Sequence, residues 1–323
     1  MTSSQKAITK VVLGAMSFGR KNVAPHCRVT DLDSGNSILD VFQKHGHTEI
    51  DTARRYGNGT PETMLGDLKR QERSLVISTK DLPAFHSNPE TAIPEGWDFD
   101  QHYHPDMLRL TLQKSLAELR MNLLHVYCFG LDGSVPQSNI FCGINEVHQE
   151  GLSAKLGLTC LPTWEVAQIC ELCDREGWVK PSVYQGKYNV LHRTVEPELF
   201  PCLRHYGIKF YAFNPIAGGF LAGGESHERN KNGSYGNEKY FAAMELPDPV
   251  VEKHGSTLRE CALRWLAHHS LLGVGKGDAV WMDASSAAHL ESNLEKGPLP
   301  DVVVGALDRG WERVRGVRWK YWG

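Results

Sequence analysis

The chain has 323 residues, of which 41% are hydrophobic and 23% are charged, and its formal net charge is -3. This length fits two ordinary domains or one large barrel, and the near-neutral charge argues against a nucleic-acid or polyanion partner, whose binding surface would be basic. The amino-terminal MTSSQKAITK has no apolar core, and the chain has no run of 18 apolar residues. We therefore expect a cytoplasmic protein with neither a secretory signal nor a membrane span.

The eight cysteines do not indicate a disulfide framework in a chain of this length. Four of them lie inside apolar runs, where a thiol behaves as a small hydrophobic group: Cys128, Cys160, Cys202 and Cys261. Cys170 and Cys173 form a C-x-x-C in a helical pattern, but no second pair follows at zinc-finger spacing. We expect no metal site.

Short β-rich runs alternate with longer helical patterns from end to end. The expected strands are residues 10–16, 47–53, 74–80, 123–129, 154–160, 182–188, 209–215 and 279–285. Between them, apolar residues recur at three- and four-residue spacing, which is typical of amphipathic helices. Eight strands, each followed by a helix, predict a single α/β domain over 1–323, a (β/α)8 TIM barrel. A doubly wound sheet is the alternative, weakened because no G-x-G-x-x-G follows the first strand.

Two long polar segments interrupt this alternation, residues 81–105 after the third strand and residues 222–249 after the seventh. Both fall on the C-terminal face, where barrel active sites are built. Loops of this length in a compact domain are usually functional or disordered. The second is the better candidate for a flap that closes over a ligand, and plain disorder explains it equally well.

Residues able to carry acid–base chemistry gather at the ends of the second and third expected strands. Asp51 ends one apolar-rich run, Tyr56 follows it, and Lys80 is the last residue of SLVISTK. A tyrosine with a pKa of about 10 is a poor proton donor until neighbours such as a carboxylate and an amine tune it. Alternatively, Asp51 caps a helix and Tyr56 lies half-buried in a loop; this stretch by itself leaves the two interpretations evenly balanced.

Several long motifs span nearly the whole chain: VVLGAMSFG, EIDTARRYGNGTPETMLG, KLGL with PTWEVAQICELC, VYQGKYN, LFPCLRHYGIKFYAFNPIAGG and ALRWLAHHS. Together they resemble the aldo-keto reductases, and most closely the aflatoxin-aldehyde reductase subfamily. The resemblance implies a (β/α)8 barrel that binds NADPH without a Rossmann motif and moves a hydride to an aldehyde or ketone carbon. It implies that Tyr56 protonates the oxygen, that Lys80 favours the phenolate by its charge, and that Asp51 holds Lys80 in place.

One catalytic position departs from the family pattern. The family has a histidine at the end of the fourth strand, where this sequence has Gly130 in LLHVYCFGLDGS. That histidine orients the carbonyl, and the loss of a preorganised donor can cost roughly two to three orders of magnitude in rate. His125 is a poor substitute, because an odd offset along a strand places it on the other face. Alternatively, a larger or differently shaped substrate fills the space beside Gly130.

The resemblance also assigns residues to the nicotinamide end of the cofactor. The Ser-Asn pair that holds the carboxamide in the family is Thr159-Cys160 here, while Gln185 keeps the other carboxamide contact. Phe213 replaces the tyrosine that stacks on the nicotinamide ring and preserves the stacking area.

At the adenosine end, Asp283 replaces a family glycine ahead of Ser285 and Ser286, and Ser292 and Asn293 fall where the family contacts adenine. A carboxylate beside a 2′-phosphate repels it by roughly 1 kcal/mol or more. The substitution could therefore shift the preference from NADP(H) to NAD(H), or weaken the site altogether. The two serines also fit a plain helix-capping role.

Two further features stay open. Arg54 and Arg55 could be solvated, or could meet an acidic substrate or a cofactor phosphate. The carboxy-terminal RGVRWKYWG contains Trp319, Tyr321 and Trp322. By resemblance this tail could fold over the substrate pocket, with Tyr321 lining it, or it could simply pack on the barrel.

The sequence thus predicts an NADPH-dependent oxidoreductase that acts on a small-molecule aldehyde or ketone. A homodimer is an open expectation, because the nearest subfamily tends to dimerise but no diagnostic patch is visible. Gly130, Cys160 and Asp283 motivate a second hypothesis, a non-redox isomerase, dehydratase or cyclase in which Tyr56 and Lys80 form an acid–base pair. A non-catalytic binding barrel is the least favoured hypothesis, because a protein without chemistry has little use for the Asp, Tyr and Lys trio.

Overall fold

The computed structural model describes residues 10–68, 72–81, 104–129, 135–223, 235–294, 297–317 and 320–322. Gly130, Trp319 and most of the segment 81–105 lie outside these ranges. Among the helices that are described, none combines the length and the apolar character needed to cross a membrane.

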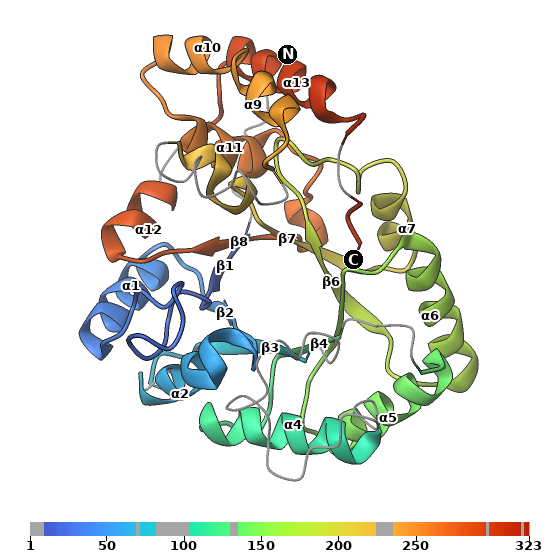
Figure 1. Ribbon diagram of the computed structural model, residues 1–323. Coiled ribbons are helices and arrows are strands. Elements are labelled where there is room, and N and C mark those ends of the chain that lie inside the picture. Colours follow the sequence, from blue (N-terminus) through green and yellow to red (C-terminus); the bar gives the residue numbers. More distant parts are fainter. Residues whose placement is uncertain are drawn as a thin grey trace.

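Eight parallel strands close into a barrel in chain order, with β1 paired to β8 (Figure 1). The strands are β1 (Lys10–Gly14), β2 (Glu49–Asp51), β3 (Val76–Asp81), β4 (Val126–Phe129), β5 (Leu156–Thr159), β6 (Pro181–Lys187), β7 (Lys209–Phe213) and β8 (Ala279–Asp283). Each overlaps one of the predicted runs, and the (β/α)8 barrel is confirmed.

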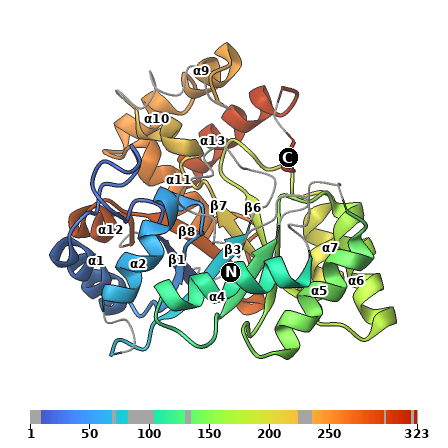
Figure 2. The ribbon, with the colours of Figure 1, turned by 60° about the horizontal axis from the view of Figure 1, so that its bottom comes forward.

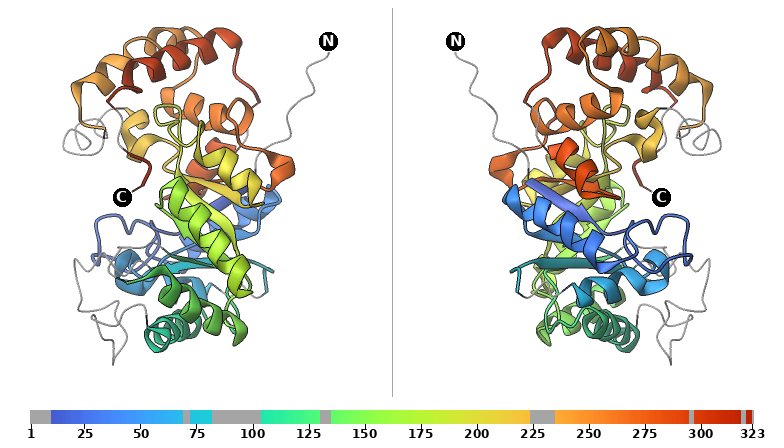
Figure 3. Two further views of the ribbon diagram at one scale, coloured as in Figure 1. Left: turned by 90° about the vertical axis from the view of Figure 1, so that its right-hand side faces the viewer. Right: turned by 90° about the vertical axis from the view of Figure 1, so that its left-hand side faces the viewer.

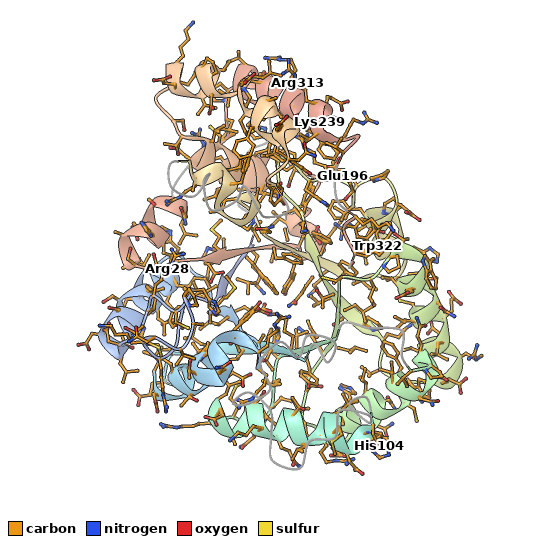
Figure 4. All side chains as sticks on the ribbon, in the orientation of Figure 1. Arg28, His104, Glu196, Lys239, Arg313 and Trp322 are labelled. Atoms are coloured by element: carbon orange, nitrogen blue, oxygen red, sulfur yellow. The ribbon has the colours of Figure 1, made fainter. Side chains whose placement is uncertain are left out.

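The strands are short and apolar because both of their faces are covered. Outward-facing side chains such as Leu13, Ile50 and Ile77 pack beneath the helices in the main core. Inward-facing side chains form a second cluster that fills the barrel (Figure 4): Val12, Val126, Cys128, Val183, Tyr211, Ala279 and Trp281. Two-residue alternation along each strand therefore decides which side chains reach the barrel axis.

Helices surround the barrel (Figure 2). They are α1 (Leu32–Lys44), α2 (Thr60–Asp67), α4 (Pro105–Glu118), α5 (Gln137–Gln149), α6 (Thr163–Glu176), α7 (Leu199–His205), α11 (Leu258–His268) and α12 (Ala287–Leu294). Local signals fix several of their ends: the Asp31 side chain accepts the Ser34 N–H at 2.8 Å to start α1, and Gly177 ends α6 in the left-handed region. Both are common helix caps.

The prediction of one long loop over residues 222–249 was wrong for its second half, and residues 224–234 lie outside the described ranges. The second half contains α9 (Glu238–Met244) and the start of α10 (Asp248–Lys253), which pack with α13 (Asp301–Val314). Figure 3 shows these helices as a group beyond one side of the barrel. Helices of seven and six residues are too short to reveal a helical period, and they are stable because tertiary packing buries residues such as Tyr240 and Met244.

A close approach between α2 and α4 gives a test of this packing. A Cβ atom on Gly66 would lie 2.2 Å from the carbonyl oxygen of Glu118, which a backbone held in α4 cannot avoid. We expect Gly66→Ala to lower the free energy of unfolding by about 1–3 kcal/mol, measured by chemical denaturation. Gly275→Ala is the matched control, because a Cβ there meets no atom within 4 Å. Equal effects of the two substitutions would contradict the prediction.

Candidate active site

The three predicted acid–base residues meet at the C-terminal mouth of the barrel, the end formed by the carboxyl ends of the strands. Asp51 ends β2, Lys80 lies near the end of β3, and Tyr56 begins the short 3-10 helix η1 (Tyr56–Gly59). Lys80 Nζ donates to Asp51 Oδ2 at 2.5 Å and to the carbonyl oxygen of Thr52 at 2.8 Å. It also lies 5.1 Å from the centre of the Tyr56 ring. The structure therefore brings a phenol, an amine and a carboxylate together.

Burial governs the protonation of this group. It raises the pKa of Asp51 to about 6, although Lys80 and Gln185 oppose the shift. Burial also raises the pKa of Tyr56, against the opposing charge of Lys80, and Asp51 and Asp283 add to the rise. Burial disfavours the charge on Lys80, but Asp51 and Tyr56 outweigh it and raise the Lys80 pKa. Near neutral pH the site therefore holds a protonated phenol beside a Lys80–Asp51 ion pair.

Gln185 extends this group towards β5. Its Nε2 donates to Asp51 Oδ1 at 3.0 Å, and Thr159 Oγ1 donates to its backbone carbonyl at 3.1 Å. Its Oε1 is buried and has no hydrogen-bond partner among the residues that the structure describes. A buried acceptor without a donor costs free energy. An amide N–H of a ligand would satisfy this acceptor, which is a contact that a nicotinamide carboxamide can make.

Two inward-facing residues of the site escaped the sequence analysis. The Trp281 ring lies 4.5 Å from Lys80 Nζ and 6.1 Å from the Phe213 ring, and its Nε1 has no partner within the described residues. Lys187 pairs with Phe213 in the sheet and is half-buried, and burial lowers its pKa against the opposing influence of Cys160. Trp281 lies two residues before Asp283, and Lys187 lies two residues after Gln185. Because side chains alternate along a strand, this spacing was the signal that could have identified both residues.

At the end of β8, Asp283 is exposed at the C-terminal mouth and accepts the backbone N–H groups of Met16 and Ser17. Its carboxylate packs against Gly14, the last residue of β1: a Cβ atom on Gly14 would lie 2.9 Å from Asp283 Oδ1. The negative charge that the sequence placed in the phosphate segment is thus held over the end of β1. Its charge also reaches Tyr56, whose pKa it helps to raise.

The predicted adenosine-end residues lie at the start and along the length of α12. Ser286 Oγ accepts the His289 N–H at 3.2 Å, which is the capping role expected of it, and Ser285 Oγ lies 3.0 Å from His289 Nδ1. Further along α12, Ser292 and Asn293 both accept from Nη2 of Arg259, at 3.1 and 2.8 Å. The spacing of residues gave no signal for Arg259, because it comes from α11.

Arg54 is neither solvated nor free for a phosphate. It is 7% exposed, and its Nη1 donates to Oε2 of the fully buried Glu62 at 2.9 Å. The other carboxylate oxygen of Glu62 accepts from Thr79 Oγ1 at 2.7 Å. This network ties the turn that holds Tyr56 to α2 and β3. Arg55, in contrast, is exposed.

The carboxy-terminal tail docks beside β5. The hydroxyl of Tyr321 accepts the Thr163 backbone N–H at 3.1 Å and lies 2.6 Å from Thr163 Oγ1. Tyr321 is 4% exposed and packs against Trp322, which Figure 4 labels. Thr163 is the first residue of α6 and follows Cys160 by three residues. The tail therefore lies next to Thr159 and Cys160, the pair predicted to hold the carboxamide. Its pocket-lining role stays a prediction, and Gly130 lies outside the described residues.

Comparison with known proteins places this site in context. The model of the aldo/keto reductase family matches residues 10–312. The chain is 42% identical over 298 residues to an aldo-keto reductase of Pseudocercospora fijiensis (strain CIRAD86), covering 86% of this chain and 97% of that protein. It is 37% identical over 339 residues to human aldo-keto reductase family 7 member A3, covering 96% of each. It is 36% identical over 332 residues to human aflatoxin B1 aldehyde reductase member 4, covering 95% of each.

The Arg54–Glu62 pair gives a stability prediction. Arg54→Met leaves the Glu62 charge buried without its partner, so we expect the free energy of unfolding to fall by about 3–5 kcal/mol. The double variant Arg54→Met/Glu62→Gln should regain much of this loss, because it leaves neither charge unpaired. Chemical denaturation measures both. As a control, Arg175→Met removes an exposed pair with Glu176 and should cost less than about 1 kcal/mol; an Arg54→Met variant as stable as this control would show that the buried pair does not matter.

Proposed function

Because the chain belongs to the aldo/keto reductase family, and is thus an oxidoreductase, we propose that it reduces an aldehyde or ketone with a nicotinamide cofactor and that Tyr56 is the proton donor. The observation that carries this proposal is the contact between the Lys80–Asp51 ion pair and the Tyr56 ring. A carbonyl group needs a proton at its oxygen when a hydride reaches its carbon, and this group of side chains supplies one.

Tyr56, Lys80 and Asp51 have different roles in the proposed reaction. The raised pKa of Tyr56 keeps its hydroxyl protonated at neutral pH, so it can donate to the carbonyl oxygen of the substrate. As the proton leaves, the Lys80 ammonium stabilises the phenolate that remains. Asp51 holds Lys80 by the 2.5 Å hydrogen bond and is itself fixed by Gln185. The cofactor, when bound, supplies the hydride.

The cofactor proposal rests on residues at both ends of the site. At the nicotinamide end, the Oε1 of Gln185 has no partner among the described residues and fits a carboxamide N–H. Thr159 and Cys160 lie beside it, and Phe213 is available for stacking. At the adenosine end, the residues that fit are Ser285, Ser286, Ser292, Asn293 and Arg259. Since the Arg259 guanidinium favours a phosphate, we propose NADP(H), with NAD(H) as the alternative because Asp283 opposes a phosphate.

A second candidate is the non-redox reaction on the same barrel. From the sequence, Tyr56 and Lys80 were expected to form the acid–base pair of this reaction, but Asp51 holds Lys80 as an ammonium. Asp283, whose charge adds to the rise in the pKa of Tyr56, is a carboxylate outside this pair that would accept a proton while Tyr56 donates one. Isomerisation, dehydration and cyclisation need such an acid–base couple and no net hydride. Turnover of a substrate without consumption of reduced cofactor distinguishes this candidate from the reductase.

Cofactor affinity tests the role of Asp283. We expect micromolar binding of NADPH in a titration that follows tryptophan fluorescence, with Trp281 as the reporter inside the site. Asp283→Gly should tighten NADPH binding about fivefold or more, the equivalent of roughly 1 kcal/mol, and should change NADH binding little. Asp283→Asn separates charge from bulk and should give a similar gain. If neither cofactor binds to the natural protein at millimolar concentration, the reductase proposal fails.

Replacement of Tyr56 tests the proton donor. Tyr56→Phe removes the hydroxyl and keeps the ring beside Lys80, so we expect kcat for carbonyl reduction to fall by about 10²–10⁴-fold while cofactor affinity stays unchanged. Single-turnover kinetics with a screened aldehyde or ketone measure the first effect, and the fluorescence titration measures the second. A Tyr56→Phe enzyme with full activity would exclude Tyr56 as the donor.

A further inference from the structure

The N-terminal mouth of the barrel, the end opposite the proposed active site, gathers three lysines that the proposed reaction does not use. Lys10 and Lys209 are the first residues of β1 and β7, and Lys155 immediately precedes β5. Lys10 and Lys209 lie two residues before Val12 and Tyr211, whose side chains fill the barrel interior. Because side chains alternate along a strand, both lysines belong to the inward-facing set. They are therefore directed towards the barrel axis.

Glu49, the first residue of β2, neutralises one of these charges. Its side chain is fully buried and forms an ion pair with Lys10. Tyr211 donates its hydroxyl to Glu49 Oε2 at 3.1 Å, and Ser78 Oγ donates to Oε1 at 3.2 Å. The carboxylate is thus fully engaged by hydrogen bonds from three directions.

Lys155 and Lys209 lack a carboxylate partner within the described part of the chain. Lys155 Nζ lies 3.2 Å from Nε2 of His125, which is itself 3.9 Å from Glu49 Oε2. The next carboxylate on this side, Asp278, is held by Arg204 at two oxygens, 2.9 and 2.5 Å away. Among the described residues, three ammonium groups at this mouth therefore face one carboxylate that is not paired with an arginine, Glu49, which leaves an excess of two positive charges.

These charges are close enough to repel one another. Burial lowers the pKa of Lys155, and the charges of Lys209 and Lys10 lower it further, with Glu49 opposing them. Burial also lowers the pKa of His125. The charges of Lys155, Lys10 and Lys209 lower it further, and the charge of Glu49 opposes them. The mouth is open to solvent on the side of Lys10, whose side chain is 43% exposed. It therefore combines uncompensated charge, ammonium donors and an entry path, which are the requirements of an anion site.

We propose that the N-terminal mouth of the barrel binds a dianionic phosphate group through Lys155 and Lys209, with Lys10 at its edge. A dianion matches the excess of two positive charges and removes the repulsion between the lysines. The natural source is either inorganic phosphate or the phosphate group of a small monoester, since the same donors recognise both. This site is separate from the phosphate position proposed beside Arg259, which lies next to α12 at the other end of the strands.

Thermal unfolding of the full chain tests the site. Sodium phosphate at 10 mM should raise the melting temperature by a few degrees over sodium chloride at equal ionic strength, because a ligand that binds only the folded protein stabilises it. The variant Lys155→Met/Lys209→Met keeps the apolar stems of both side chains and should lose this shift. In chloride it should melt at the natural temperature or above, because the repulsion is gone. Phosphate titration by calorimetry should show the same loss of binding.

Two controls locate the response. Lys180→Met removes an exposed lysine paired with Asp174 and should keep the full phosphate shift. Arg259→Met removes the guanidinium proposed for the cofactor phosphate and should keep the part of the shift that Lys155→Met/Lys209→Met loses. Phenyl phosphate in place of inorganic phosphate separates the two sources: a larger shift with the ester identifies a monoester ligand, and a smaller shift identifies the free anion. The proposal is overturned if phosphate and chloride act alike, if the shift survives in Lys155→Met/Lys209→Met, or if Arg259→Met abolishes it.

Discussion

The buried ion pair between Lys80 and Asp51 is the interaction on which the proposed chemistry depends. A lysine that is 5% exposed and an aspartate that is 1% exposed are tolerated inside a protein only when they are paired and hydrogen-bonded. Barrel closure supplies that condition, because it places the ends of β2 and β3 side by side and brings Gln185 from β6 to the remaining carboxylate oxygen. The charge on Lys80 is thereby fixed beside the Tyr56 ring, where a phenolate would form.

The barrel interior separates charge into two regions. At the C-terminal mouth, Asp51, Tyr56 and Lys80 form the proposed catalytic group, and Asp283 adds a carboxylate. At the other mouth, lysines predominate. Between them lies the apolar layer of inward-facing side chains that includes Val12, Val183, Tyr211 and Trp281. An apolar layer does not screen charge, so the two groups still interact: Glu49 at the basic mouth adds to the rise that burial causes in the pKa of Asp51.

The structure shows where the residues lie at which the sequence predicts departures from the family pattern. Asp283 is held over Gly14 by backbone N–H groups, so its charge has a fixed place near the β1 end. Cys160 occupies the left-handed region at φ 57°, a conformation that Asn adopts more readily. The buried Arg54–Glu62 ion pair, which is not one of these predicted departures, joins the turn before Tyr56 to α2. Each of these residues therefore has a fixed place around the proposed catalytic group.

The sequence by itself determined the (β/α)8 barrel and the meeting of Asp51, Tyr56 and Lys80, because strand alternation, helical spacing and long motifs are local signals that survive in a single chain. Other contacts were decided only by tertiary structure. The Arg54–Glu62 ion pair joins the turn after β2 to α2, and the guanidinium that joins Ser292 to Asn293 reaches α12 from α11. The helix α9 is stable because it packs on α13. Pairing across the fold depends on barrel closure and packing, which no local pattern of residues encodes.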